Sequence, residues 1–172
     1  RVEILTNKSE TIEDLYGFEF PFNQGLNIIA GENSRGKTTI NSCIFYALGM
    51  EELLGGNNNK ALDKALKDTF VIKTDGIEED DEETGENYIV SRSKVFLEIE
   101  NDKNEIVCLE RVISSLNKKE KLSNITIYKS KLDRINTETA KAVFFVNGQG
   151  NNDDPNGFYE WLTSFLDIVV PK

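Results

Sequence analysis

The chain has 172 residues, of which 38% are hydrophobic and 29% are charged, and its formal net charge is −10. This composition excludes a disordered or fibrous chain, and its apolar runs are too short to cross a bilayer. The acidic total argues against a dedicated DNA-binding module, and the lack of histidine argues against a zinc site. Two isolated cysteines fit a reducing, cytoplasmic compartment, and the length fits one domain with one hydrophobic core.

The first fifty residues predict three strands and a helix. Alternating polar and apolar residues predict a short strand over Val2–Leu5 and a half-buried strand over Leu15–Phe22. The stretch Leu26–Ala30 is short and rich in β-formers, so we expect a buried strand there. Apolar residues at helical spacing then predict a helix over Lys37–Met50.

The rest of the chain predicts mostly strands. A short helix is expected over Ala61–Leu66, and the six carboxylates of Glu78–Glu83 predict a solvated loop. Strands are expected over Thr69–Lys73, Tyr88–Glu100, Glu105–Ile113, Ser123–Lys129 and Ala142–Val146. The turn signal at Asn101–Asn104 joins two of these strands into a predicted hairpin. A stripe of large apolar residues predicts a closing helix over Phe158–Ile168.

One motif carries chemistry. The stretch Gly31–Thr38 matches G-x-x-x-x-G-K-[ST] at every fixed position and lies between a predicted strand and a predicted helix, as a phosphate-binding loop requires. Phosphate oxygens need many donors at close range. The glycines at Gly31 and Gly36 let the backbone N–H groups point inward, and the helix after them presents its positive end.

The loop predicts a site for the phosphates of a nucleoside triphosphate, with ATP and Mg²⁺ as the expected ligands. We expect the cradle itself to come from Gly31, Asn33, Ser34, Arg35 and Gly36. Three further side chains are expected to bind the ligand. Lys37 should contact the β- and γ-phosphates, Thr38 should coordinate magnesium, and Thr39 should donate to the α-phosphate. An ordinary glycine loop that caps a helix would show the same residues without this chemistry.

The stretch Gly25–Ile40 resembles the head domain of SMC-like ATPases, the group of chromosome SMC proteins, RecN, RecF and their relatives. Those heads read G-x-N-G-x-G-K-[ST]-[ST] after a G-L-N-x-I-x strand, and Ser34 stands here where they have glycine. The resemblance implies an α/β fold of α+β character. Its P-loop NTPase lobe would have a mixed sheet, an antiparallel β-meander beside the nucleotide and a helix after the P-loop.

The resemblance also implies residues outside the loop. The family's Q-loop glutamine touches magnesium and the attacking water, and Gln149 is the candidate here, with an ordinary turn residue as the alternative. The family's Walker B aspartate-glutamate pair and switch histidine have no counterpart, because the chain has no histidine and no apolar strand ending in Asp-Glu. We therefore expect residues 1–172 to be the N-terminal lobe of a head, cut where a coiled coil would begin and nearly inactive alone.

Partners follow from the same resemblance. It implies the C-terminal lobe of the same protein, a second head joined through ATP as a homodimer, and DNA, with a role in DNA repair or genome defence and no membrane contact. The lysine-rich stretch Lys118–Arg134 is either a contact for DNA phosphates or a solvated hairpin edge.

Two other functions remain open. A small GTPase or P-loop kinase would share the glycine-rich loop. A GTPase also needs N-K-x-D, however, and Asn59–Leu62 has leucine in place of the aspartate. A non-catalytic interaction domain would bind nucleotide only as a structural ligand, and the lack of Walker B residues fits that alternative.

Overall fold

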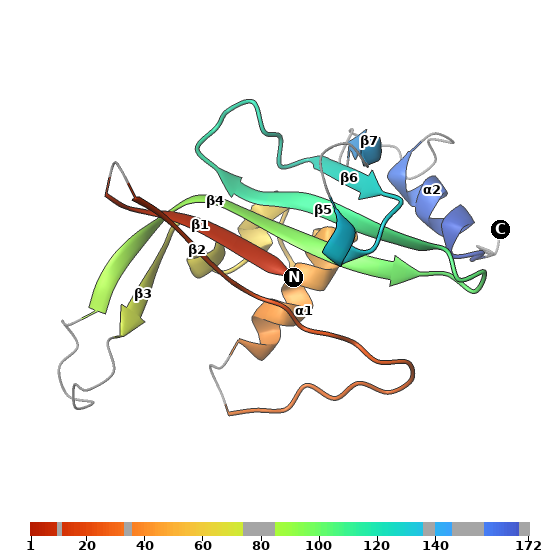
Figure 1. Cartoon of the computed structure of the whole chain (residues 1–172), viewed down its shortest axis with the longest axis horizontal. Coiled ribbons are helices and arrows are strands. Elements are labelled where there is room, and N and C mark those ends of the chain that lie inside the picture. The colour runs from red at the N-terminus through yellow and green to blue at the C-terminus, as the bar shows by residue number, and fades with distance from the viewer. Residues whose placement is uncertain (10–11, 33–35, 74–84, 136–139, 146–156, 169–172) are drawn as a thin grey trace.

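The structure, a computed structural model, describes residues 1–9, 12–32, 36–73, 85–135, 140–145 and 157–168. The strands in this part of the chain are β1 (Val2–Ser9), β2 (Ile12–Phe18), β3 (Thr69–Lys73), β4 (Gly85–Glu100), β5 (Ile106–Ser115), β6 (Asn124–Tyr128) and β7 (Ala140–Phe145). The helices are α1 (Lys37–Ala47) and α2 (Phe158–Phe165), with short 3-10 turns at η1 (Glu51–Leu54), η2 (Asn58–Ala61), η3 (Lys64–Leu66) and η4 (Leu132–Arg134). Figure 1 shows β4 and β5 crossing the molecule, with α1 beneath them and α2 near the C-terminal end.

The described strands form one seven-stranded sheet in the order β2-β1-β4-β5-β6-β7, with β3 also pairing with β4. Every pairing among them is antiparallel. Strand β4 has 16 residues, long enough to pair with β1 and β5 through much of its length and with β3 at its start. The α+β class, the antiparallel meander and the helix after the glycine-rich loop are confirmed, while the mixed character expected of the sheet is not seen among the described strands.

The period of two along β4 divides the core between the faces of the sheet. Val95 and Leu97 face the helices. There, one cluster joins β1 and β4 to Cys43, Tyr46 and Ala47 of α1, and a second joins β5 and β6 to α2. Phe96, between them in sequence, lies on the opposite face in a smaller cluster packed against η4. The helix that follows the glycine-rich loop is therefore fixed to the sheet by its C-terminal half.

The strand predicted over Leu26–Ala30 is wrong: this segment is in no ladder of the described sheet. Its apolar side chains face solvent, with Leu26 88% and Ile28 76% exposed. A strand needs a neighbour to accept and donate its backbone hydrogen bonds, and the described residues supply none here. The segment after β2, residues 19–32, instead runs as an extended arm below the sheet (Figure 1).

Other boundaries shift in ways that local chemistry explains. The strand expected to reach Phe22 ends at Phe18, before Pro21, which has no N–H to donate to a ladder. The expected helix over Ala61–Leu66 is two 3-10 turns, η2 and η3, with Leu62 between them in an extended conformation. The acidic run Glu78–Glu83 lies outside the described residues.

Candidate nucleotide-binding site

The helix α1 begins at the motif. Gly36 precedes its first residue with φ of 82°, in the left-handed region that favours glycine, and no side chain caps the helix there. The first turn contains no acidic residue. Helix N-termini carry N–H groups without intrahelical partners and a partial positive charge. These free N–H groups and this charge suit an anion.

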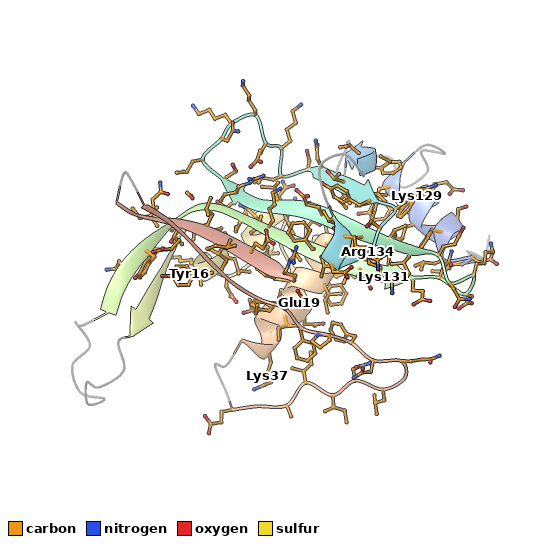
Figure 2. All side chains as sticks on the ribbon, in the orientation of Figure 1. Tyr16, Glu19, Lys37, Lys129, Lys131 and Arg134 are labelled. Atoms are coloured by element: carbon orange, nitrogen blue, oxygen red, sulfur yellow. The ribbon has the colours of Figure 1, made fainter. Side chains whose placement is uncertain are left out.

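Lys37 folds back over the loop that precedes it. Its Nζ donates to the carbonyl oxygen of Gly31 at 2.6 Å and to that of Glu32 at 2.5 Å. Figure 2 shows Lys37 at the end of α1 nearest the arm. Lys37 is half-buried as a residue, and the two acceptors of its ammonium group are backbone oxygens that a phosphate can replace. This contact ties the first residues of the motif to its lysine.

The two threonines of the motif take different positions. Thr38 is exposed at the start of α1, where its hydroxyl can serve as one oxygen ligand of a Mg²⁺ that keeps several waters. The Thr39 hydroxyl donates to Oδ2 of Asp63 at 2.5 Å. Asp63 was not predicted as a site residue. It lies between η2 and η3, 24 positions after Thr39, and no sequence pattern there indicates that the two side chains meet.

Four of the predicted site residues lie outside the described part of the chain. These are Asn33, Ser34 and Arg35 in the loop, and Gln149, which follows β7. The predicted strand before Gln149 is confirmed, with an end at Phe145. The described site therefore comprises Gly31, Gly36, Lys37, Thr38 and Thr39.

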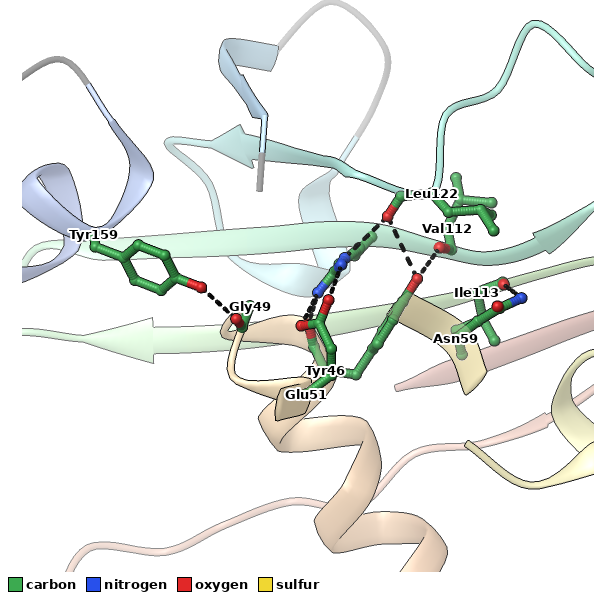
Figure 3. Close-up of polar contacts among 9 residues, drawn as sticks. Tyr46, Gly49, Glu51, Asn59, Val112, Ile113, Leu122 and Tyr159 are labelled. Atoms are coloured by element: carbon green, nitrogen blue, oxygen red, sulfur yellow. Dashed lines mark hydrogen bonds and ion pairs between the residues drawn. The ribbon is translucent and has the colours of Figure 1, made fainter. Parts of the chain in front are cut away.

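The far end of α1 is fixed by a buried ion pair. Arg111 on β5 donates through Nη1 and Nη2 to both carboxylate oxygens of Glu51, each at 2.7 Å, and both side chains are fully buried. The same guanidinium donates to the carbonyl oxygen of Tyr46 at 2.6 Å and lies 3.9 Å from the centre of the Tyr46 ring. Figure 3 shows this cluster, together with the Tyr159 hydroxyl that donates to the carbonyl oxygen of Gly49.

Burial shifts the titration of groups on this helix. Desolvation raises the pKa of Tyr46 to about 12, and the phenol donates its proton to the carbonyl oxygen of Val112 at 2.7 Å. Burial likewise raises the pKa of the Cys43 thiol to about 12. A thiol with so high a pKa is inert at neutral pH, so Cys43 is a core residue and not a nucleophile.

A family model described as AAA domain matches residues 11–155. The chain belongs to this AAA-type family of P-loop ATPases. The match covers the whole glycine-rich loop, so nucleotide binding and, in general, ATPase chemistry are properties of its family. No curated protein and no solved structure matches the chain.

Among the residues that the structure describes, no group of three or more histidine, cysteine, aspartate or glutamate side chains gathers to hold a metal ion. No described helix has both the length and the apolar content needed to cross a membrane.

Proposed function

We propose that this chain binds Mg-ATP as the N-terminal half of an SMC-like ATPase head, which pairs with a second head through ATP and acts on DNA. The observation that carries the proposal is Lys37, whose ammonium folds onto Gly31 and Glu32 at an uncapped helix end. The sequence around this lysine supports the SMC-like assignment within the AAA-type family. The two unpaired cysteines support a cytoplasmic location.

Each described residue has a role in this proposal. Lys37 exchanges its two carbonyl acceptors for oxygens of the β- and γ-phosphates. Thr38 offers a hydroxyl to the magnesium ion that accompanies the triphosphate, and Thr39 donates to the α-phosphate. Phosphoryl transfer depends mainly on positioning and charge stabilisation, so these contacts supply part of what hydrolysis needs. Gln149 is proposed as the residue that orients the attacking water.

The exposed side chains of the arm favour the proposal of a partner lobe. Leu26 and Ile28 alternate along an extended segment and face solvent, which is the pattern of a strand whose neighbour is supplied by another part of the protein. Beside it, a groove of about 360 Å³ is lined by Phe20 and Phe22 of the arm and by Ile40 and Ile44 of α1. We propose that the C-terminal lobe of the same protein pairs with this segment and fills the groove.

DNA binding is proposed for the basic stretch. Lys129 and Lys131 precede η4 and Arg134 ends it (Figure 2). The β5–β6 connection adds Lys118 and Lys119, both exposed. Cationic side chains on one surface are sufficient for contact with phosphates. Replacement of Lys118 and Lys119 by glutamate should weaken DNA binding and lower the slope of log affinity against log salt concentration by about 2. Lys103→Glu, on the β4–β5 turn, is the control; equal losses would contradict a specific basic surface.

The nucleotide proposal is tested by calorimetric titration with ATP and with GTP, each with magnesium. The variants are Lys37→Ala and, as the matched control, Lys103→Ala, which removes one exposed lysine far from the loop. We expect heat of binding with ATP for the original chain and the control, and a loss of at least tenfold in affinity for Lys37→Ala.

Two results would change the conclusion. Binding of GTP in preference to ATP would favour a GTPase over an SMC-like head. Equal affinity of the original chain and Lys37→Ala for ATP would show that the glycine-rich loop does not hold the phosphates.

A further inference from the structure

The contact between Thr39 and Asp63 joins the phosphate-binding motif to a connection that the motif does not contain. Thr39 lies in the first turn of α1, and Asp63 lies between η2 and η3. The hydroxyl of Thr39 donates to Oδ2 of Asp63 at 2.5 Å. The Asp63 side chain is exposed, so neither burial nor packing requires this contact.

The connection that carries Asp63 is held firmly to the sheet. Leu62 and Leu66, on either side of the aspartate, are 4% and 3% exposed in the same core cluster as α1. The ammonium of Lys67 donates to the carbonyl oxygens of Asn59 at 2.8 Å and Leu62 at 2.5 Å. The backbone on both sides of Asp63 is thus fixed, and the carboxylate stays near the start of α1.

The Asn59 side chain adds a direct bond from this connection to the sheet. Its Nδ2 donates to the carbonyl oxygen of Ile113 at 2.9 Å (Figure 3). Ile113 is fully buried on β5. A shift of Asp63 away from α1 would therefore strain the internal bonds of the connection and the bond that joins it to β5.

A threonine hydroxyl has one proton to donate. Thr39 can give that proton to Asp63 or to the α-phosphate, but not to both at once. When a nucleotide takes it, the Asp63 carboxylate loses its donor and faces another anion at short range, which costs free energy even in a solvated site.

We propose that Asp63 is a positioning residue that holds the Thr39 hydroxyl in the nucleotide-free protein and so lowers nucleotide affinity. The inference rests on the proposed function of the same loop. Nucleotide binding requires an exchange in which Thr39 leaves the carboxylate for the α-phosphate. Asp63 thereby favours release of the bound nucleotide, whether it is ATP or ADP.

The test is calorimetric titration of the chain with Mg-ATP and Mg-ADP in four forms: the original, Asp63→Asn, Asp63→Ala and Asp68→Asn. Asp68 is an exposed aspartate on the same connection, so its replacement changes the net charge equally without touching Thr39. We expect Asp63→Ala to bind about threefold to tenfold more tightly, from one released hydrogen bond and one removed repulsion. Asp63→Asn should gain less, because it removes the repulsion but its amide oxygen can still accept from Thr39. The gain should be equal for ATP and ADP, because both carry an α-phosphate.

A double-mutant cycle with Thr39 separates this role from a scaffolding one. In a Thr39→Val background, Asp63→Ala should give a smaller gain, because the hydroxyl exchange is already gone. A Thr39→Ser background should keep the full gain, because serine keeps the donor.

Three outcomes would overturn the inference. Unchanged or weaker affinity in Asp63→Ala would show that the carboxylate does not oppose the nucleotide. An equal gain in Asp68→Asn would show an effect of net charge alone. Absence of ATP binding in the original chain and in every variant would instead sink the nucleotide-binding proposal itself, and this inference with it.

Discussion

The sheet and the arm differ in which side chains they bury and in where polar side chains find hydrogen-bond partners. On the sheet, even a charged residue as large as Arg111 is fully buried, because the Glu51 carboxylate and the carbonyl oxygens of Tyr46 and Leu122 accept from its donors. On the arm, apolar side chains such as Leu26 face solvent at 88% exposure. The polar side chain of Asn27 bonds to the arm's own backbone, at the carbonyl oxygens of Asn23 and Gly25.

This difference in burial indicates that the sheet, and not the arm, determines the stability of the molecule. The buried apolar side chains of the described residues come from the sheet, the helices and the 3-10 turns and not from the arm, so the free energy of unfolding should come mainly from those elements. The arm leads into the glycine-rich loop and contributes little burial. Substitutions in the two regions should therefore have effects of very different size.

The largest effect is expected from breaking the buried ion pair. Arg111→Met leaves the Glu51 carboxylate buried without its partner, which should lower the free energy of unfolding by about 3–5 kcal/mol. The double variant Arg111→Met with Glu51→Leu should be more stable than the single one, because no charge is left buried. Urea unfolding followed by circular dichroism measures both. A loss below about 1 kcal/mol in the single variant would mean that solvent reaches Glu51.

A matched pair of leucines tests the comparison directly. Leu109 on β5 is fully buried, so Leu109→Ala should cost about 3 kcal/mol of unfolding free energy through lost burial and a cavity. Leu26→Ala on the arm should change it by less than about 0.5 kcal/mol. The same urea titration serves for both, and similar losses in the two variants would show that the arm packs against the sheet in solution.

Much of this fold follows from local pattern. The alternation along β4 and β5, with a turn at Asn101–Asn104 between them, predicted the central hairpin, because a period of two is the period of a β-strand. The stripe on α1 was predicted for the same reason at helical spacing. The strand over Leu26–Ala30 was predicted wrongly. Its composition is typical of a buried strand, but composition does not say which segment would pair with it.

The candidate site also contains residues that local sequence could predict and residues that it could not. The glycine-rich loop could be predicted because phosphate chemistry dictates its residues at fixed spacing, and Lys37 lies at the start of α1 as expected. Asp63 could not be predicted, because its contact with Thr39 depends on how η2 and η3 pack on the sheet. The role expected of Gln149 stays a prediction.

A smaller effect should appear at alkaline pH. Burial raises the folded pKa of Tyr46 to about 12, from 10.0 for a free tyrosine. Below pH 10 both states keep the phenol proton, and between pH 10 and 12 only the folded state does, so stability falls as pH rises, by up to about 1.4 kcal/mol per pH unit. Tyr46→Phe should show a shallower fall between pH 9 and pH 11 in urea unfolding. An unchanged slope would mean that other groups, such as the buried thiols, account for all of it.

The smallest effect should come from the link between α2 and the end of α1. Tyr159→Phe removes the hydroxyl that donates to the carbonyl oxygen of Gly49, and we expect a loss of about 1 kcal/mol. Trp161, the only tryptophan, stacks on Phe165 in α2, so its fluorescence reports whether that helix stays docked. Tyr46→Phe is the control, because the hydroxyl that it removes bonds to the sheet. This variant should shift the fluorescence and circular dichroism transitions together. If Tyr159→Phe shifts fluorescence alone, α2 unfolds before the sheet; if it shifts neither, Gly49 does not hold the helix.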